Sequence, residues 1–341
     1  MRAYFHPDQL LHRPMSYFSR GAMRQPQEVP ERASRLLQAI EALGFDIRAP
    51  GDHGMAPLEA VHTGAYLEFL RTAHDRWLEA SPDWGDEVMS NIFVREPNAM
   101  RGILAEAAFH LADGSCPIGE MTWRSAYWSA QSAIAAARAV IEGEPVVYAL
   151  CRPPGHHTRK DSAGGFCYIN SAAIAAQELR SEFGKVLVLD TDVHHSQGTQ
   201  DIFYDRADVM TISVHANPEN FYPVVTGFEE ETGAGAGTGF NRNFPVPHGA
   251  SEERFFEHVD RAIEAGRGFA PDALVFAHGF DIYVEDPQSP IGVGAEGFGR
   301  LGERIAALGL PTVIVQEGGY HLDTLASNAR RFFTAFLNRR E

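Results

Sequence analysis

Residues 185–195 read Lys-Val-Leu-Val-Leu-Asp-Thr-Asp-Val-His-His, an apolar run that leads directly into carboxyl and imidazole side chains. Because nearly every position before these side chains is apolar, the run is typical of a parallel strand that is buried on both faces. Similar apolar runs occur at residues 146–150, 209–214, 273–277 and 312–315. Helical patterns alternate with these runs and cover residues 170–183, 251–267, 296–308 and 321–337. The alternation predicts a single α/β domain with a doubly wound, mainly parallel sheet flanked by helices.

The charge and composition of the chain exclude several classes of protein. Its 341 residues contain 29 Lys or Arg and 45 Asp or Glu, which gives a formal net charge of −16. Such an acidic chain repels phosphate backbones and attracts cations, so we expect no nucleic-acid partner. No apolar stretch is long enough to cross a bilayer, so we also expect no membrane partner. The cysteines Cys116, Cys151 and Cys167 are too few for a disulfide framework, which favours a cytoplasmic location.

Residues 81–122 interrupt the alternation of strands and helices. Polar, proline and glycine residues are interleaved there with short apolar pieces, and connections of this length usually form lids, binding loops or interfaces. The larger apolar side chains of this stretch are too numerous to stay solvated on a monomer: Trp84, Ile92, Phe93, Ile103, Leu104 and Phe109. We therefore expect one domain over residues 1–341, in which an insertion at about residues 81–122 shapes the active-site mouth and a homodimer interface.

Carboxyl and imidazole side chains follow two of the predicted strands. Side chains alternate between faces in an extended chain, so Asp190, Asp192 and His194 can converge on one side. Asp281 follows the run at residues 273–277, whose end should lie at the same edge of the sheet. Buried carboxylates that converge in this way repel one another unless a cation lies between them. Asp192, His194 and Asp281 therefore predict a zinc site with a position left open for water, although an Asp-x-His pair alone is commonly just a surface strand end.

Two further motifs carry side chains suited to amide chemistry. Residues 151–157 read Cys-Arg-Pro-Pro-Gly-His-His, a rigid turn that holds His156 and His157 together. One imidazole can accept a proton while the other donates one, provided that their surroundings separate the two pKa values. Residues 317–320 read Glu-Gly-Gly-Tyr. The phenol of Tyr320 can stabilise an oxyanion, although a tyrosine after glycines is commonly only a turn residue.

Several motifs together resemble the arginase/deacetylase superfamily of zinc amidohydrolases. They follow one another along the chain in the same order as in that family, at residues 151–157, 164–170, 190–195, 198–200 and 317–320. Two N-terminal segments, at residues 29–34 and 61–67, resemble further landmarks of the family. The resemblance covers nearly the whole chain. Within the superfamily the sequence most resembles the bacterial acetylpolyamine amidohydrolases, whose long insertion before the catalytic core is similar to the interrupting stretch described above.

The resemblance implies roles for the metal-binding and catalytic residues. It assigns one zinc ion per subunit to three ligands: Asp192, His194 and Asp281. It implies that His157 is the general base and that His156 is an electrostatic partner or an acid. Tyr320 would donate a hydrogen bond to the oxyanion.

The resemblance also implies a substrate path, made of Arg32, Gly165, Phe166 and Tyr222. Phe166 and Tyr222 would form the walls of a narrow channel. The carbonyl of Gly165 would orient the scissile amide, and Arg32 would lie beside the exit for acetate. Apart from the resemblance, we expect the N-terminal segment around Tyr17 to help the insertion narrow the mouth of this channel.

Structural potassium is a further property of the family. One potassium site matches the side chains of Asp190, Asp192 and His194 with the backbone of Ser213 and Val214. A second site matches another set of positions: Phe203, Arg206, Val209 and Phe240.

The chain departs from the family pattern at four positions. Ser196 and Gln197 stand where many deacetylases have Gly-Asp and the polyamine enzymes have Gly-Asn. Gln197 brings no charge to the neighbouring histidine, so His157 should be less basic than it would be beside Asp. His278 stands where a small or apolar residue is usual, and we interpret it as a core histidine in preference to a partner of the site. Ser115 takes the place of an acidic contact of the polyamine enzymes.

The sequence as a whole predicts a zinc-dependent amidohydrolase that removes an acetyl group from acetylated polyamines or similar small cationic amines. Its channel should be narrow and negative. Six carboxylates of the insertion are candidates for binding a distal ammonium, or are simply solvated: Asp83, Asp86, Glu87, Glu106, Asp113 and Glu120. The alternative enzyme is a protein acetyl-lysine deacetylase, which would need a rim open to a polypeptide. A zinc-free binding protein would require the loss of a ligand or of Tyr320, and an arginase-type ureohydrolase would require a second set of metal ligands.

Overall fold

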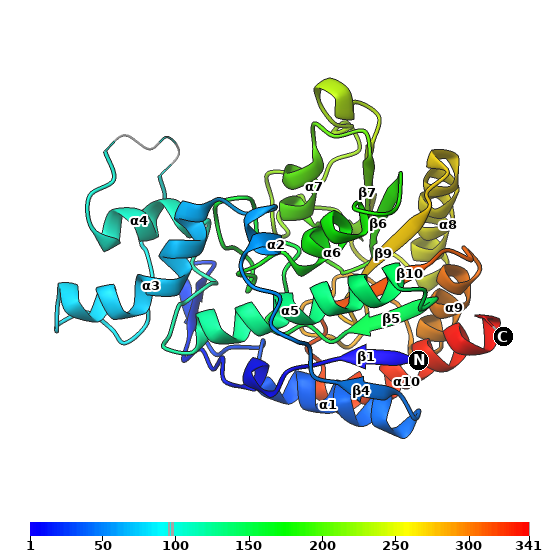
Figure 1. Cartoon of the computed structure of the whole chain (residues 1–341), viewed down its shortest axis with the longest axis horizontal. Helices are drawn as coiled ribbons and strands as arrows, with labels where there is room; N and C mark the ends of the chain where they lie inside the picture. Colours follow the sequence, from blue (N-terminus) through cyan, green and yellow to red (C-terminus); the bar gives the residue numbers. More distant parts are fainter. Residues whose placement is uncertain (95, 97–98, 341) are drawn as a thin grey trace.

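An eight-stranded sheet in which all neighbouring strands are parallel forms the centre of the protein (Figure 1). The computed structural model describes residues 1–94, 96 and 99–340. The order of the strands is β4-β1-β5-β10-β9-β6-β7-β8. Their bounds are β1 (Arg2–Tyr4), β4 (Asp46–Arg48), β5 (Val146–Ala149), β6 (Val186–Asp190), β7 (Val209–Ala216), β8 (Asn241–Val246), β9 (Ala273–His278) and β10 (Thr312–Gln316).

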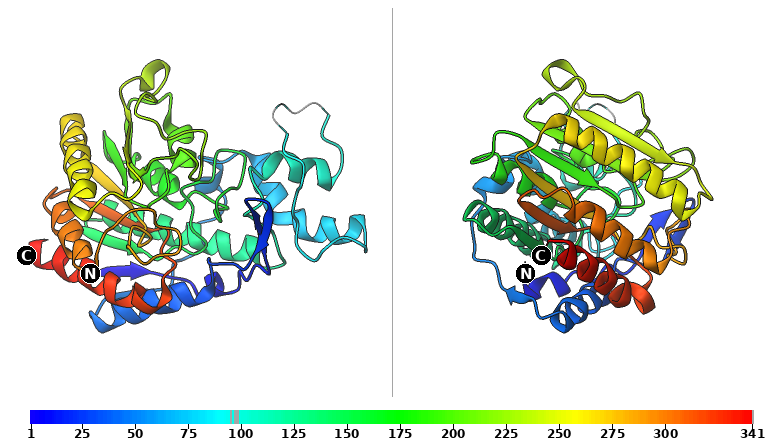
Figure 2. Two further views of the ribbon diagram at one scale, coloured as in Figure 1. Left: turned by 180° about the vertical axis from the view of Figure 1, so that it is seen from behind. Right: turned by 90° about the vertical axis from the view of Figure 1, so that its right-hand side faces the viewer.

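Helices cover both faces of this sheet (Figures 1 and 2). One layer includes α5 (Thr122–Ile141), α6 (Ser171–Leu179) and α7 (Gln197–Phe203). The other consists of α1 (Pro30–Ala42), α8 (Glu252–Phe269), α9 (Ala295–Ala306) and α10 (Leu322–Arg340). In β9, Val275 and Ala277 belong to the first core, whereas Leu274 and Phe276 belong to the second. The strands are therefore buried on both faces, as their continuous apolar sequence indicated.

This architecture confirms the predicted fold class. The five apolar runs form the adjacent strands β5, β10, β9, β6 and β7, and the four predicted helices are present with ends that differ by a few residues. Three of these strands continue one residue further than the apolar run, into Asp190, His278 and Gln316. The polar residues of the carboxyl edge are therefore part of the hydrogen-bonded sheet.

Two segments lie at one end of the molecule, away from the main sheet (Figure 2). One is an antiparallel hairpin of β2 (Tyr17–Ser19) and β3 (Ala22–Arg24). The other is the insertion, which contains α4 (Ile103–His110) and follows α3 (Gly64–Ala80); the short α2 (Ala56–Glu59) precedes α3. The N–H of Phe18 donates to the carbonyl of Gly114 at 2.8 Å, so the hairpin and the insertion are joined directly.

The apolar side chains of the insertion differ in their burial. Ile103 is only 5% exposed, whereas Ile92 and Phe93 are 53% and 45% exposed and Leu104 is 37% exposed. Positions 95, 97 and 98 of the insertion lie outside the described residues. Among the described helices, none has the length and apolarity that crossing a membrane requires.

Candidate metal and catalytic site

Three neighbouring strands bring the candidate residues to one edge of the sheet. Asp190 at the end of β6 lies opposite Ala277 of β9, and Gln316 at the end of β10 lies opposite His278. The segments that follow these strands carry Asp192, His194, Asp281 and Tyr320. Because the carboxyl ends of parallel strands share one edge, residues that are far apart in the sequence meet there.

The side chains of Asp192, His194 and Asp281 form a buried triad. Their potential ligand atoms all lie within 4.8 Å of one another, and the residues are 1%, 6% and 0% exposed. Nδ1 of His194 lies 3.0 Å from Oδ1 of Asp192 and 3.4 Å from Oδ2 of Asp281. The N–H of Val193 donates to Oδ1 of Asp281, but Oδ2 has no hydrogen-bond partner among the described residues. A buried carboxylate oxygen without a partner leaves a position in which a further group, such as a cation, could be bound.

The charges of the triad suit a cation. Burial and the neighbouring Asp192 raise the pKa of Asp281 to about 8. Burial alone would lower the pKa of His194, but Asp192 and Asp281 raise it to about 9. Two carboxylates and an imidazole are donor types that zinc prefers, and a divalent cation would compensate the negative charge that burial disfavours. The residues present therefore fit a zinc ion.

Two glycines make room for the triad. A Cβ atom at Gly318 or at Gly279 would overlap carboxylate oxygens of both Asp192 and Asp281. The N–H of Gly318 also donates to Oδ2 of Asp192 at 2.7 Å. The glycines in front of Tyr320 and Asp281 therefore allow the backbone to approach the carboxylates closely.

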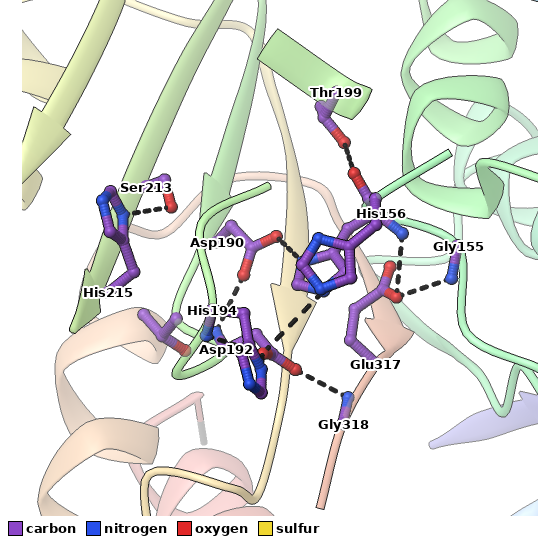
Figure 3. A network of polar contacts seen from close by, with 12 residues as sticks. Gly155, His156, Asp190, Asp192, His194, Thr199, Ser213, His215, Glu317 and Gly318 are labelled. Atoms are coloured by element: carbon purple, nitrogen blue, oxygen red, sulfur yellow. Dashed lines mark hydrogen bonds and ion pairs between the residues drawn. The ribbon is translucent and has the colours of Figure 1, made fainter. Parts of the chain in front are cut away.

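His156 is a buried histidine that is anchored by carboxylates (Figure 3). Its Nδ1 lies 2.9 Å from Oδ2 of Asp190, and its backbone N–H donates to Oε2 of Glu317 at 3.1 Å. Burial acts to lower the pKa of His156, but Asp190 and Asp192 raise it to about 10. The carboxylates therefore favour the protonated form of His156 over the neutral form that a base needs.

His157 has the opposite electrostatic character. Its ring centroid lies 3.9 Å from that of His156. Burial, followed by repulsion from His156 and His194, lowers the pKa of His157 well below its usual value. Its Nδ1 lies 2.7 Å from Oε1 of Gln197. The surroundings thus shift the pKa values of the two adjacent histidines in opposite directions, which is the separation that acid–base chemistry requires.

Tyr320 is fixed through its backbone and through its ring. Its N–H donates to Oδ2 of Asp286 at 2.6 Å, and the guanidinium of Arg32 lies 4.7 Å from its ring centre. Arg32 also donates to the carbonyl oxygens of Glu317 and Gly319, each at 2.6 Å, and so holds the loop that carries the tyrosine. Burial raises the pKa of Tyr320 well above its usual value, so the phenol keeps its proton and can act as a donor.

A cavity of about 560 Å³ joins these groups to the surface. Its lining includes His157, His194 and Tyr320 together with all the predicted substrate residues except Arg32: Tyr17, Gly165, Phe166 and Tyr222. The ring of Phe166 makes edge contacts with those of Tyr17 and Tyr320, at centroid distances of 5.0 and 5.9 Å. Aromatic side chains therefore narrow the path to the triad, while Arg32 lies behind Tyr320.

A family comparison identifies the domain that carries this site. Residues 26–336 match the histone deacetylase domain. The chain belongs to the histone deacetylase domain family.

Two of the relatives that match nearly the whole chain are bacterial proteins. The chain is 64% identical over 336 residues to an acetylpolyamine amidohydrolase of Burkholderia pseudomallei, and the match covers 98% of each protein. It is 38% identical to acetylpolyamine amidohydrolase 1 of Pseudomonas aeruginosa, with 96% of each chain covered. The crystal structure of the acetylpolyamine aminohydrolase from Burkholderia pseudomallei superimposes with a TM-score of 0.99 at 64% identity, and the alignment covers 100% of both chains.

The charged side chains that line the cavity are positive, whereas we expected a negative channel from the net charge. Arg20 and Arg24, both exposed on the β2–β3 hairpin, line the cavity. Among the described residues, no Asp or Glu lines it. The net charge of −16 therefore does not describe the local surroundings of the channel. A larger hollow of about 710 Å³ between α9 and α10 contains none of the candidate site residues.

The insertion carboxylates do not form an ammonium site within the described chain. None of the six lines the cavity. Glu106 pairs with Arg76, and Asp113 accepts a hydrogen bond from Tyr222 at 2.7 Å. Glu87 accepts the N–H of Met15 at 3.0 Å, while the other three, Asp83, Asp86 and Glu120, are exposed. Ser115 is the residue of the insertion that lines the cavity.

His278 lies in the core of the domain. It packs on Phe276, Phe280 and Phe332, and burial lowers its pKa to about 3. Its Nδ1 lies 3.3 Å from the hydroxyl of Thr191. These contacts agree with the interpretation of His278 as a core histidine.

The residues of the two predicted potassium sites lie in two places near β7. Asp190 pairs in register with Ser213, which Val214 follows, and Oδ1 of Asp190 accepts the N–H of Asp192. The second set is Phe203 and Arg206 near the end of α7, Val209 at the start of β7, and Phe240 just before β8. The carbonyls of Phe203 and Phe240 already accept hydrogen bonds from Arg206 and Thr211.

Sequence reasoning missed several residues that support the site. Asp286 holds the backbone of Tyr320, and Glu28 binds the guanidinium groups of Arg32 and Arg152 at 3.0 and 2.8 Å. Asp113 was predicted only as a possible ammonium ligand or a solvated carboxylate, whereas it accepts a hydrogen bond from Tyr222 across 109 positions of sequence. An isolated acidic residue in a loop carries no local pattern, so only the folded chain reveals these contacts.

Proposed function

We propose that this protein is a zinc-dependent amidohydrolase that removes an acetyl group from acetylated polyamines or similar small cationic amines. The observation that carries the proposal is the buried triad of Asp192, His194 and Asp281, with its unpartnered carboxylate oxygen, beside a cavity that His157 and Tyr320 also line. One zinc ion per chain would be held by these three residues. The substrate class is supported by relatives that are named acetylpolyamine amidohydrolases and match nearly the whole chain.

The residues around the cavity suit hydrolysis of an amide. Zinc held by the triad would polarise the amide carbonyl and make water more acidic. The neutral imidazole of His157 accepts the proton of the attacking water, because its pKa is too low for it to be protonated beforehand. A histidine then gives a proton to the leaving amine nitrogen as the C–N bond breaks. Tyr320 donates its phenolic proton in a hydrogen bond to the oxygen that becomes negative. His156 stays charged and stabilises the negative charge that accumulates nearby.

The shape of the channel favours a slender amine. Tyr17, Phe166 and Tyr222 present aromatic walls to a cavity that ends at buried groups. A flexible chain with a terminal acetamide can pass such walls, whereas a folded protein surface cannot. A protein acetyl-lysine deacetylase remains the alternative, because an acetyl-lysine side chain has the same terminal amide.

Acetate release from matched substrates tests the function. With zinc-loaded enzyme, we expect kcat/KM for N-acetylputrescine or a longer acetylpolyamine to exceed that for an acetyl-lysine peptide by about 10-fold or more, about 1.4 kcal/mol of discrimination. A preference for the peptide would contradict the substrate class and leave the hydrolytic chemistry intact. Failure to cleave any of the acetamides would contradict the amidohydrolase itself.

The arginines of the hairpin should weaken the binding of a cationic substrate. Replacing both of them, as Arg20→Gln with Arg24→Gln, should lower KM for N-acetylputrescine by about 3-fold or more at low salt, because a charge pair in water is worth about 1 kcal/mol at contact. The neutral analogue N-acetylbutylamine should keep its KM. A matched charge control is the pair Arg71→Gln and Arg267→Gln, since neither residue lines the cavity. An equal change for the charged and neutral substrates would show that the hairpin acts by shape alone.

We also propose the remaining family properties for this chain. The exposed Ile92, Phe93 and Leu104 support a homodimer in which the insertion contributes to the interface and to the channel mouth. Potassium at the two sites described above would be structural. The three free, buried cysteines support a cytoplasmic location.

A further inference from the structure

A chain of hydrogen bonds connects the insertion to His157. The hydroxyl of Tyr222 donates to Oδ2 of Asp113 at 2.7 Å. Nε2 of Gln197 donates to the same hydroxyl at 3.1 Å, and Oε1 of Gln197 lies 2.7 Å from Nδ1 of His157. Gly164 leaves room for this chain, because a Cβ atom there would lie 2.9 Å from the hydroxyl of Tyr222 and 3.1 Å from Oδ2 of Asp113.

The carboxylate of Asp113 sets the direction of the first hydrogen bond. Both of its oxygens accept from backbone donors, Oδ1 from the N–H of Ser115 at 2.8 Å and Oδ2 from the N–H of Gly165 at 3.1 Å. The hydroxyl of Ser115 donates to Oδ1 as well. Because N–H donors already face both carboxylate oxygens, the Tyr222 hydroxyl is the donor in its contact with Oδ2. Burial and Asp113 raise the pKa of Tyr222 well above its usual value, which keeps that proton on the phenol.

The direction of the first bond determines the orientation of the Gln197 amide. The only proton of the Tyr222 hydroxyl is used for Asp113, so its oxygen can only accept from Gln197. The NH₂ group of Gln197 must therefore face Tyr222, and its carbonyl oxygen must face Nδ1 of His157. A carbonyl accepts a hydrogen bond only from a protonated Nδ1, which leaves the lone pair of a neutral imidazole on Nε2.

We propose that Asp113 and Tyr222 are positioning residues that, through Gln197, hold His157 in the tautomer protonated at Nδ1, with Nε2 free to accept a proton. The inference rests on the proposed role of His157 as the base. The Gln197 amide needs an orienting partner because either its oxygen or its NH₂ group can face Nδ1 of His157. If the Gln197 amide were flipped, its NH₂ group would donate to Nδ1 and the imidazole proton would move to Nε2. Nε2 could then no longer accept a proton from water.

The Tyr222→Phe variant of the zinc-loaded enzyme tests this proposal, because it removes one hydroxyl and retains the aromatic wall. We expect kcat to fall by about 10-fold or more, the usual loss when the partner of a functional histidine is removed, while KM changes by less than about 2-fold. The Tyr66→Phe variant is a matched control: it removes a buried phenol that donates to the carbonyl of Tyr168 at 2.7 Å, outside this chain of hydrogen bonds. An unchanged kcat in the Tyr222→Phe variant would overturn the proposal.

Nitrogen NMR identifies the tautomer of His157 independently of catalytic activity. With ¹⁵N-labelled histidine, and with the His157 signals assigned by their loss in the His157→Ala variant, the native enzyme should show a protonated Nδ1 and an unprotonated Nε2. Tyr222→Phe and Asp113→Asn should each produce a mixture of tautomers. A native His157 protonated at Nε2, or spectra unchanged by both variants, would contradict the proposal even if the enzyme proved inactive on every acetylpolyamine.

A second substitution separates positioning from a general structural effect. Glutamate at position 197 accepts at both of its oxygens, so it needs no orienting partner. Adding Gln197→Glu to Tyr222→Phe should therefore restore the Nδ1-protonated tautomer and most of the lost kcat. If the double variant shows the same mixture of tautomers as Tyr222→Phe alone, the hydroxyl of Tyr222 does not act through Gln197.

Discussion

The Asp281→Ala variant should lose most of its bound zinc and about 10³-fold or more of its amide hydrolysis, since a Lewis acid contributes several kcal/mol to such a reaction. Asp281 supplies one of three candidate ligands, and its Oδ2 forms no hydrogen bond in the described part of the chain. The variant should still fold. Burial and Asp192 already raise the pKa of this carboxyl to about 8, so its removal relieves the repulsion between two buried acids.

Elemental analysis, acetate release and thermal unfolding of the purified variant check this expectation. A suitable control is Asp201→Ala, which removes a carboxylate that pairs with Arg159 outside the triad. The control should retain both zinc and turnover. An Asp281→Ala variant that keeps stoichiometric zinc and full turnover would show that the ligand assignment is wrong.

The Tyr320→Phe variant should lower kcat by on the order of 10²- to 10³-fold, which is the usual loss for one donor to an oxyanion. The change removes only the hydroxyl. The ring over which Arg32 lies remains, and so does the backbone hydrogen bond to Asp286. Zinc content and the unfolding temperature should therefore stay close to those of the native enzyme.

Steady-state kinetics and metal analysis separate this role from a structural one. The Tyr283→Phe variant is the control, because it removes a hydroxyl that donates to Glu285 at 2.9 Å and does not line the cavity. If kcat for Tyr320→Phe equals that of Tyr283→Phe, the phenol of Tyr320 takes no part in the reaction.

The central strands could be predicted because each is apolar on both faces. In β9, for example, alternate side chains enter two different cores, so no polar residue interrupts the run. The strands at the two ends of the strand order have no such continuous apolar sequence. β1 and β4 contain three residues each, too few for a pattern, and β8 includes Asn241, Arg242 and Asn243. β4 and β8 are the two edge strands and β1 pairs with β4, and all three are specified by their neighbours in the folded chain more than by their own sequence.

The candidate site was predictable where its residues follow strands directly. Asp192 and His194 come just after β6, so the topology alone places them at the carboxyl edge. The charge of the channel mouth was not predictable, because it depends on which loops reach the cavity. Arg20 and Arg24 do so through a hairpin that lies far in the sequence from the catalytic motifs, which is why the total charge was a poor guide.

Asp113 illustrates why the contacts that support a functional site cannot be predicted from the sequence. In the sequence it was one of six acidic residues of the insertion, any of which could be solvated or could bind an ammonium group. In the fold it accepts hydrogen bonds from Ser115, Gly165 and Tyr222, two of which lie far along the chain. Its role follows from its hydrogen-bond partners, and these are brought together only by the tertiary structure.

The most direct test of the account is a zinc titration of metal-depleted enzyme with acetate release from N-acetylputrescine as the readout. The triad of Asp192, His194 and Asp281 predicts that activity is absent without metal and rises linearly to a plateau at one zinc per chain. The Asp281→Ala variant should show no such plateau at the same zinc concentrations. Full hydrolysis by the metal-depleted enzyme, or identical titrations of the native and variant proteins, would contradict the claim that this triad binds the zinc on which hydrolysis depends.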